Sequence, residues 1–387
     1  MRLDRGIILV MTYIGLNAHL LASAANYRRA GIHGYIYHLL AHLPSAAPDW
    51  QFKVFVGKGE PPSNAHHTLQ RSSINTESPL RRIFWEQFVQ PFQLGGLDLV
   101  HQLAFVAPVA DILLPRPFVV TIYDLSFIRY PERLPTSRRL YLNLMTRLAC
   151  RRARRVMAIS RSTAEDLVSL LGVPRAKIDL AIPGVEARFT PLPTDQVEAW
   201  RAQKGLPKRF FLFVGTLEPR KNLMTLVRAY ADLPQPLRQT THLILGGGKG
   251  WMTDDLPKTI ESLGIHNTVH LPGYLPDEEL IWWYNCAVAL VFPSVFEGWG
   301  LPVTEAMACG VPPIVSNVSS LPEAANGAGI TLPPDDIGAW THALARAATD
   351  LDWRERQSKN ALEQVKQFTW AQTAQQTVNS YRKALGL

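Results

Sequence analysis

Two glutamates that lie eight positions apart have the spacing and setting of a binding site. Glu297 follows the apolar run 287–292, which predicts a buried parallel strand, and Glu305 lies in a helix predicted from Leu301 to Cys309. Ligands of open α/β sheets bind beyond the carboxyl ends of the strands. Each carboxylate can accept hydrogen bonds from two hydroxyls, so the pair suits a hydroxyl-rich ligand. The alternative is a solvated Glu297 and a Glu305 that only favours the helix dipole.

The start of the same helix is expected to bind negative charge. Its first backbone N–H groups are expected to be free and to lie at the positive end of the helix dipole, where they could hold a diphosphate. Arg220 and Lys221 follow the predicted strand 210–214 and could neutralise that diphosphate. An Arg-Lys pair is usually only solvated, but its position at a strand end favours function. The predicted diphosphate-binding residues of the helix start are Gly298, Trp299, Gly300, Leu301, Pro302 and Val303.

The segment from Glu297-Gly-Trp-Gly-Leu-Pro through Glu305-Ala-Met-Ala-Cys-Gly resembles the E-x7-E signature of the retaining glycosyltransferases of family 4. Segments 214–223, 245–248, 271–274 and 315–323 are similar to further family segments, in family order. The resemblance covers nearly all of the second half of the chain and, more loosely, the first half. It implies an α/β protein with the GT-B fold. In that fold two Rossmann-like, doubly wound parallel-sheet domains face a central cleft, and a C-terminal helix crosses back to the first domain.

The resemblance also implies roles for individual residues. Glu305 would hold the ribose of a nucleotide sugar, Glu297 the sugar hydroxyls, and Arg220 and Lys221 the diphosphate. Other implied donor-binding residues are Gly215, Thr216 and Gly247 at strand ends, Gly273 and Tyr274 beside the base, and Gly31 and Gly34 in an amino-terminal glycine loop. For Gly247, Gly31 and Gly34 an ordinary turn is the alternative, and for Tyr274 a partly buried aromatic.

Two residues of the first half complete the predicted catalytic set. Segment 119–132 resembles a family segment in which a histidine near the reacting centre stands at the position of Tyr123. Tyr123 can hydrogen-bond a sugar hydroxyl but cannot carry charge near neutral pH. His101 ends the predicted strand 99–102 and is expected to face the cleft, with a structural histidine as the alternative.

A chain of 387 residues is expected to form two domains. The predicted parts are 1–190, 191–368 after a proline-rich linker, and a closing helix, 369–387. Through residue 190 there are 23 Lys/Arg and 13 Asp/Glu, a net charge of +10. The remaining residues contain 17 Lys/Arg and 19 Asp/Glu, a net charge of −2. A basic half can attract nucleic acid, anionic lipid or a phosphorylated substrate. No nucleic acid is expected, because no zinc-finger, RNA-recognition or helix-turn-helix pattern accompanies the charge.

The three cysteines, Cys150, Cys286 and Cys309, are far apart in apolar settings, which indicates a reducing, cytoplasmic compartment. The first 24 residues imitate a signal peptide. Asn17 and His19 interrupt the apolar run, however, and the fold needs a first strand at 7–16. No cofactor or metal is expected, since Arg220 and Lys221 could do a metal's electrostatic work.

The resemblance implies a retaining hexosyltransferase that uses a nucleotide sugar. The signature and segment 119–132 resemble bacterial mannosyltransferases of surface-polysaccharide assembly, so the first expectation is GDP-mannose, with a glycan or polyprenyl-diphosphate-linked acceptor. The alternatives are a UDP-sugar 2-epimerase of GT-B fold and a catalytically silent nucleotide-sugar-binding protein. The Arg- and Leu-rich segment 138–155 predicts either peripheral attachment to an anionic membrane or a helix that packs within its domain.

Overall fold

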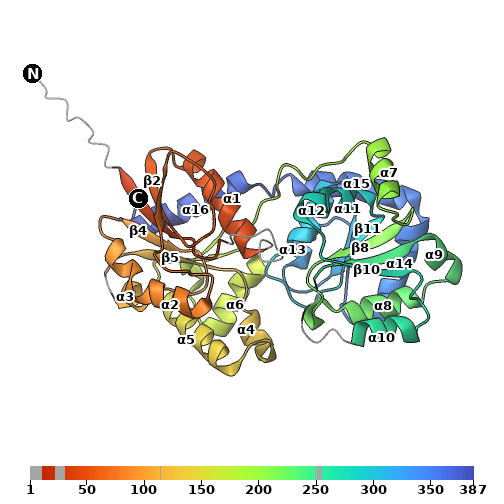
Figure 1. Ribbon diagram of the computed structural model, residues 1–387, viewed down its shortest axis with the longest axis horizontal. Coiled ribbons are helices and arrows are strands. Elements are labelled where there is room, and N and C mark those ends of the chain that lie inside the picture. Colours follow the sequence, from red (N-terminus) through yellow and green to blue (C-terminus); the bar gives the residue numbers. More distant parts are fainter. Residues whose placement is uncertain (1–10, 22–30, 114, 249, 251–254) are drawn as a thin grey trace, which may run out of the picture. The chain divides into compact units, whose positions relative to one another are not determined.

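The computed structural model describes residues 11–21, 31–113, 115–248, 250 and 255–387, which form two compact units (Figure 1). Unit 1 comprises residues 1–159, 164–182 and 370–387, and unit 2 comprises 160–163 and 183–369. The chain changes unit after Ile182, before the boundary predicted at residue 190. The reason is that the connecting segment is bonded to unit 2: the Val185 amide donates to the Phe368 carbonyl and the Leu192 amide to the Asn285 side chain.

The sheet of unit 1 is parallel throughout, in the order β3-β2-β1-β4-β5-β6-β7. The β1 and β4 strands are neighbours, so the order reverses there, as in doubly wound folds. Residues 7–10 of the predicted first strand, and part of the segment that imitates a signal peptide, lie outside the described residues. The strands are β1 (Thr12–Asn17), β2 (Trp50–Val56), β3 (His67–Arg71), β4 (Leu99–Gln102), β5 (Phe118–Ile122), β6 (Arg155–Ala158) and β7 (Ile178–Leu180).

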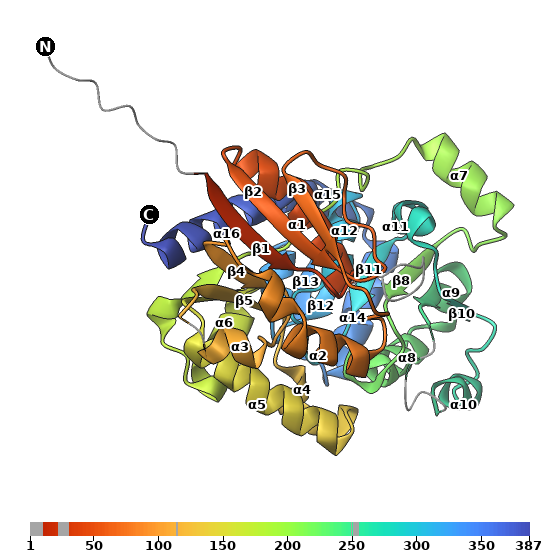
Figure 2. The same cartoon turned by 60° about the vertical axis from the view of Figure 1, so that its left-hand side comes forward.

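Helices cover this sheet on both faces. The terminal helix α16 (Trp370–Leu385) packs beside α1 (Ile32–Ala46) and against β4 to β7, which confirms that the C-terminal helix returns to the first domain (Figure 2). Buried residues of α3, α5 and α6 form a core with the opposite face of β4 to β6. The remaining helices of this unit are α2 (Pro79–Phe88), α3 (Val109–Leu113), α4 (Ser126–Arg129), α5 (Thr136–Arg152) and α6 (Arg161–Leu171), together with the 3-10 turns η2 (Gln90–Gln93), η3 (Pro131–Arg133) and η4 (Arg175–Lys177).

Unit 2 repeats the plan with a parallel sheet in the order β10-β9-β8-β11-β12-β13. Its strands are β8 (Phe210–Val214), β9 (His242–Gly246), β10 (Val269–Gly273), β11 (Ala289–Phe292), β12 (Pro313–Ser316) and β13 (Ile330–Leu332). Its helices are α7 (Thr194–Gln203), α8 (Leu223–Ala231), α9 (Gln235–Thr240), α10 (Asp255–Ser262), α11 (Leu280–Cys286), α12 (Leu301–Ala308), α13 (Leu321–Ala325), α14 (Ile337–Thr349) and α15 (Leu351–Val365), with the 3-10 turns η5 (Pro219–Lys221) and η6 (Asp277–Glu279).

Strands β8 and β11 carry the central site residues because they are neighbours in this sheet. Both are buried and entirely apolar, as expected for a parallel strand covered on two faces. The turn η5 and the segment before α12, which follow these two strands, therefore lie at the same edge of the sheet. Among the described residues, we find no helix that combines the length and the apolar character needed to cross a bilayer.

Candidate functional site

Arg220, Lys221 and Glu297 form one ion-pair cluster at the carboxyl ends of β8 and β11. Arg220 Nη1 lies 2.7 Å from Glu297 Oε2, and Lys221 Nζ lies 2.6 Å from Glu297 Oε1. Arg220 also donates to the Phe296 carbonyl. The sequence predicted these three groups at one sheet edge. It did not predict that each oxygen of Glu297 accepts from one of the two cations.

The charges of this cluster are held in place by burial and pairing. Burial alone would raise the pKa of Glu297, but Arg220 and Lys221 outweigh it and lower that pKa to about 2. Burial lowers the pKa of Lys221, and the neighbouring Glu297 opposes that change. The Lys221 ammonium also lies 5.0 Å from the centre of the Phe292 ring, a favourable cation–π distance. The carboxylate is therefore ionised throughout the physiological pH range.

Three further residues support this cluster, and the sequence prediction did not assign them a role. Glu218 Oε1 accepts from Arg220 Nε at 3.0 Å and from Nη2 at 2.8 Å, which fixes the guanidinium. The Glu297 amide donates to Ser319 Oγ at 2.9 Å, and the hydroxyls of Ser319 and Ser320 both donate to the Glu297 carbonyl. The signal for Ser319 and Ser320 was segment 315–323, which the sequence linked to the family without naming a function.

Glycine is required where two strand ends approach each other. A Cβ on Gly247 would lie 1.8 Å from the carbonyl oxygen of Gly215, far inside van der Waals contact. The Gly215 amide donates to the Gly246 carbonyl, and the Gly247 amide to the Gly273 carbonyl. These bonds bring together the predicted donor-binding glycines Gly215 and Gly247, which follow β8 and β9, and Gly273, which ends β10. Thr216 is exposed beside them, and the Tyr274 side chain is 46% exposed.

The start of α12 has the expected open amides, with one exception. In the described part of the chain, the amides of Trp299, Gly300 and Leu301 have no hydrogen-bond acceptor. The Val303 amide was predicted to be free but donates to the Gly300 carbonyl at 2.9 Å. The reason is that Gly300, with φ 111°, turns its carbonyl toward the first helical turn.

Gly298 precedes this turn. Pro302 lies in the first turn of α12, where the missing N–H of proline costs no hydrogen bond. The Trp299 ring is buried and packs edge-on against Phe368 at 5.1 Å. Trp299 thus anchors the loop to the unit, and its backbone amide is the part that is available to a ligand.

Glu305 lies one turn into α12 and is bonded to the preceding helix. Its Oε2 accepts a hydrogen bond from the hydroxyl of the fully buried Tyr284 at 2.7 Å. Burial is the main reason that the pKa of Glu305 rises from 4.5 to about 7, and the nearby Glu186 and Asp277 add to it. Arg188, which pairs with both of those acids, opposes the rise. Glu297 and Glu305 thus differ in protonation near neutral pH.

The predicted amino-terminal glycine loop is only partly within the described residues. Gly31 has φ 69° and immediately precedes α1, a position that favours glycine. Gly34 was predicted in the loop but lies in the first turn of α1, because the helix begins at Ile32. Residues 26–30 of the predicted loop lie outside the described residues.

The surroundings of Tyr123 do not support the predicted contact with a sugar. The residue is 5% exposed, and its hydroxyl donates to the Leu103 carbonyl at 2.7 Å. Its ring packs edge-on against Tyr35 and tilted against Phe105. Burial raises the pKa of Tyr123 well above its ordinary value, so the hydroxyl is neutral. These contacts give the residue a role in the core of unit 1.

The prediction that His101 faces a cleft is wrong. His101 is fully buried, with Nδ1 2.6 Å from the Tyr381 hydroxyl and Nε2 2.7 Å from Thr121 Oγ1. Side chains alternate along β4, and the face that carries His101 is covered by α16. Burial lowers its pKa to about 3, so it is neutral and structural.

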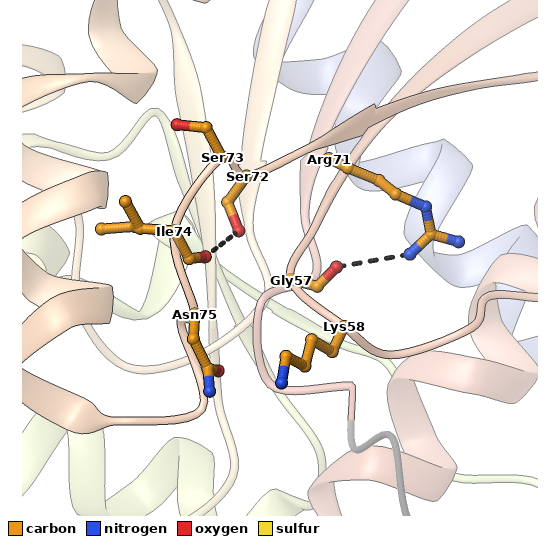
Figure 3. Close-up of a pocket in the computed structure, with 7 residues that line it drawn as sticks. All are labelled: Gly57, Lys58, Arg71, Ser72, Ser73, Ile74 and Asn75. Carbon is orange, nitrogen blue, oxygen red and sulfur yellow. Dashed lines mark hydrogen bonds between the residues drawn. The ribbon is translucent and has the colours of Figure 1, made fainter.

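A pocket of unit 1 was not indicated by any sequence motif. It has a volume of about 520 Å³ and lies where β2 and β3 end (Figure 3). Lys58 and Asn75 extend along the same side of it, whereas Arg71 donates to the Gly57 carbonyl and pairs with Glu60. Among the described residues, no group of three or more His, Cys, Asp or Glu side chains could hold a metal ion.

Comparison with known proteins identifies the family. The model of glycosyl transferases group 1 matches residues 196–364, and that of glycosyltransferase family 4 matches residues 29–189. The chain is 35% identical over 272 residues to O-antigen chain mannosyltransferase B of Escherichia coli, covering 68% of this chain and 70% of the relative. It is 28% identical over 292 residues to the serotype-specific mannosyltransferase WbdA of Escherichia coli, covering 74% of this chain but 36% of that longer protein.

Solved structures show the same fold. Sucrose-phosphate synthase from Thermosynechococcus elongatus superposes with a TM-score of 0.75 at 24% identity, over 96% of this chain and 98% of that one. WaaG, a glycosyltransferase involved in lipopolysaccharide biosynthesis, gives 0.72 at 17% identity, over 95% and 98%. The relatives and family models are all transferases, so the epimerase alternative is not favoured. The chain belongs to the GT-B glycosyltransferases of family 4 and is a hexosyltransferase.

Proposed function

We propose that this glycosyltransferase moves mannose from GDP-mannose to a hydroxyl of a bacterial surface glycan, with retention of configuration. The observation that carries the proposal is the cluster of Arg220, Lys221 and Glu297 beside the open amides of α12. The choice of mannose is supported by the two mannosyltransferase relatives. The site offers cations for a diphosphate and ionised oxygens for hydroxyls.

In the proposed mechanism, Arg220, Lys221 and the amides at the start of α12 stabilise the negative charge that grows on the diphosphate as the glycosidic bond breaks. Glu297, kept ionised by its two cations, accepts from the sugar hydroxyls and orients the reacting carbon. Glu305 accepts from the ribose hydroxyls. The acceptor hydroxyl attacks from the face that the diphosphate leaves, and a diphosphate oxygen takes up its proton. This route needs no second catalytic carboxylate of the glycosidase type.

We propose that no metal ion takes part, because Arg220 and Lys221 can balance the diphosphate charge. The chain does contain one Asp-x-Asp sequence, Asp350-Leu-Asp352. Asp350 caps the start of α15, where its side chain accepts from the Trp353 amide at 2.8 Å. Helix capping accounts for this motif without a metal.

The acceptor in this proposal is a glycan on a polyprenyl-diphosphate carrier, and the enzyme works in the cytoplasm at the inner face of the membrane. The net charge of +10 through residue 190 supports attraction to an anionic surface. Nucleic acid is not a proposed partner. In α5, the proposed membrane segment, Leu140 and Leu144 are exposed, while Met145 and Ala149 pack into the core of unit 1. The buried side of the helix packs within its domain, and its exposed leucines support the proposed attachment to a membrane.

The proposal is tested by a donor panel. Thermal shift with GDP-mannose, UDP-glucose and UDP-N-acetylglucosamine reports which nucleotide sugar binds, and transfer to a lipid-linked glycan reports turnover. We expect the largest shift with GDP-mannose and transfer that depends on acceptor. Sugar interconversion without acceptor would indicate an epimerase, and binding without any turnover would indicate a silent protein. A shift only with UDP-sugars would contradict GDP-mannose but not the transferase.

A further inference from the structure

Helix α2 of unit 1 exposes an apolar face that the core does not use. Leu80, Phe84 and Phe88 recur every fourth residue and therefore lie on one side of the helix. They are 80%, 55% and 64% exposed, whereas Trp85 is buried on the other side. The rings of Phe84 and Phe88 lie 5.3 Å apart and contact each other. Phe92, in η2 directly after α2, is 88% exposed and extends the face.

Helices α3 and α5 adjoin α2. The Val109 amide, at the start of α3, donates to the Gln87 side chain of α2 at 2.8 Å. Helix α5 runs beside α2 in both views, and the pKa of Tyr141 on α5 is raised by burial and then by Glu86 of α2 (Figures 1 and 2). The α2 face is defined by Leu80, Phe84, Phe88 and Phe92; the adjoining helices add the exposed apolar residues Val109 and Leu113 of α3 and Leu140 and Leu144 of α5.

The exposed charges of α2 and α5 are positive, although the exposed Glu77 lies just before α2. Arg81, Arg138 and Arg147 are exposed on α2 and α5. Glu86, the acid of α2, is directed inward: its Oε1 accepts from Asn17 of β1 at 3.2 Å, and burial raises its pKa. Arginine side chains at the edge of an apolar surface suit a layer of anionic headgroups above hydrocarbon.

We propose that the α2 face docks onto an anionic lipid bilayer, with Phe84 and Phe88 inserted at the level of the headgroups and Arg81, Arg138 and Arg147 against the lipid phosphates. A helix of ten residues is too short to cross hydrocarbon and lies in the interface instead. A second copy of the chain fits less well as the occupant, because a symmetric contact would bring the arginines of both copies together. The inference rests on the proposed membrane-borne acceptor and identifies the surface that reaches it.

The experiment measures flotation of the full chain with vesicles of 30% phosphatidylglycerol in phosphatidylcholine and with pure phosphatidylcholine. The test variant is Phe84→Ser/Phe88→Ser. The matched control is Leu351→Ser on α15 of unit 2, a leucine that is 57% exposed. We expect the wild type and the control to bind anionic vesicles and to be released by salt. The double variant should bind about tenfold or more weakly, because two buried aromatic side chains are lost from the bilayer contact.

Nucleotide-sugar binding and turnover on a water-soluble acceptor separate this inference from the proposed function. Both should be unchanged in the double variant, since the α2 face is not part of the cluster around Glu297. The inference is overturned if the wild type ignores anionic vesicles, or if the double variant floats as well as the control. It is also overturned if sedimentation shows a wild-type dimer that the double variant loses, because the α2 face would then join two copies. Equal melting temperatures of the variants exclude misfolding as the cause of lost flotation.

Discussion

Replacement of Glu305 by glutamine should abolish a pH dependence of donor binding that the wild type shows near neutrality. With a pKa of about 7, the Glu305 carboxyl is about 10% ionised at pH 6 and about 90% at pH 8. If only the carboxylate accepts both ribose hydroxyls, the apparent dissociation constant falls about ninefold over that range. Glutamine keeps an oxygen that can accept from Tyr284 but does not titrate, so the Glu305→Gln profile should be flat.

The same replacement should change the pH dependence of stability in a defined direction. The folded pKa of Glu305 lies above its ordinary value of 4.5. The stabilising contribution of the protonated form is therefore complete below pH 4.5 and is lost as the pH rises through about 7. At 1.36 kcal/mol per pKa unit, the loss amounts to about 3 kcal/mol. Glu305→Gln should gain stability relative to the wild type by up to that amount between pH 4.5 and 8.

Calorimetric titration with GDP-mannose from pH 5.5 to 8.5 measures the first effect, and urea unfolding over the same range measures the second. GDP-mannose is the right ligand because its diphosphate has no group that titrates near neutrality. The other predicted ligand carboxylate, Glu297, adds no pH dependence of its own, because its pKa of about 2 keeps it ionised over this pH range. A flat wild-type binding profile, or an equal slope in Glu305→Gln, would refute the assignment of the titrating group.

Three other predictions address the rest of the proposed machinery. Arg220→Ala should lower donor affinity about tenfold or more, because a charge-assisted contact is lost, and wild-type affinity and turnover would contradict its role. Tyr123→Phe should cost about 1 kcal/mol of unfolding free energy by leaving the Leu103 carbonyl without its donor, with kcat unchanged. A fall in kcat at equal stability would show instead that the hydroxyl reaches the sugar. Transfer should survive EDTA, and loss that manganese restores would indicate a metal.

The sequence predicted the cluster around Glu297 because parallel topology brings strand ends together. Arg220 and Glu297 are 77 positions apart, yet each follows a strand of the same sheet. The pairing itself could not be predicted, since the orientation of long side chains depends on the final packing. Glu218, two residues before Arg220, was passed over because nothing in its local pattern indicates burial.

The prediction for His101 was wrong, and the α2 face was not predicted, for a different reason. One partner of His101 is Tyr381, 280 positions away, on a helix whose return to unit 1 was predicted but whose position on the sheet was not. In α2, leucine and phenylalanine at helical spacing have the pattern of core residues, although the core takes up Trp85 instead. Periodicity identifies an apolar face but does not identify what covers it.

The geometry of the Glu297 cluster bears on how a donor would enter the site. Two cations and the carboxylates of Glu218 and Glu297 balance one another, so the free protein presents little net charge there. A diphosphate would have to draw Arg220 and Lys221 partly away from Glu297. That exchange would release oxygens of Glu297 for the sugar hydroxyls at the moment when the phosphates become bound. Arg220 would remain oriented by Glu218, because this contact uses Nε and Nη2, while Nη1, which donates to Glu297 and to the Phe296 carbonyl in the free protein, would turn to the ligand. In the proposed mechanism, the arrangement would link recognition of the diphosphate to recognition of the sugar through a single carboxylate.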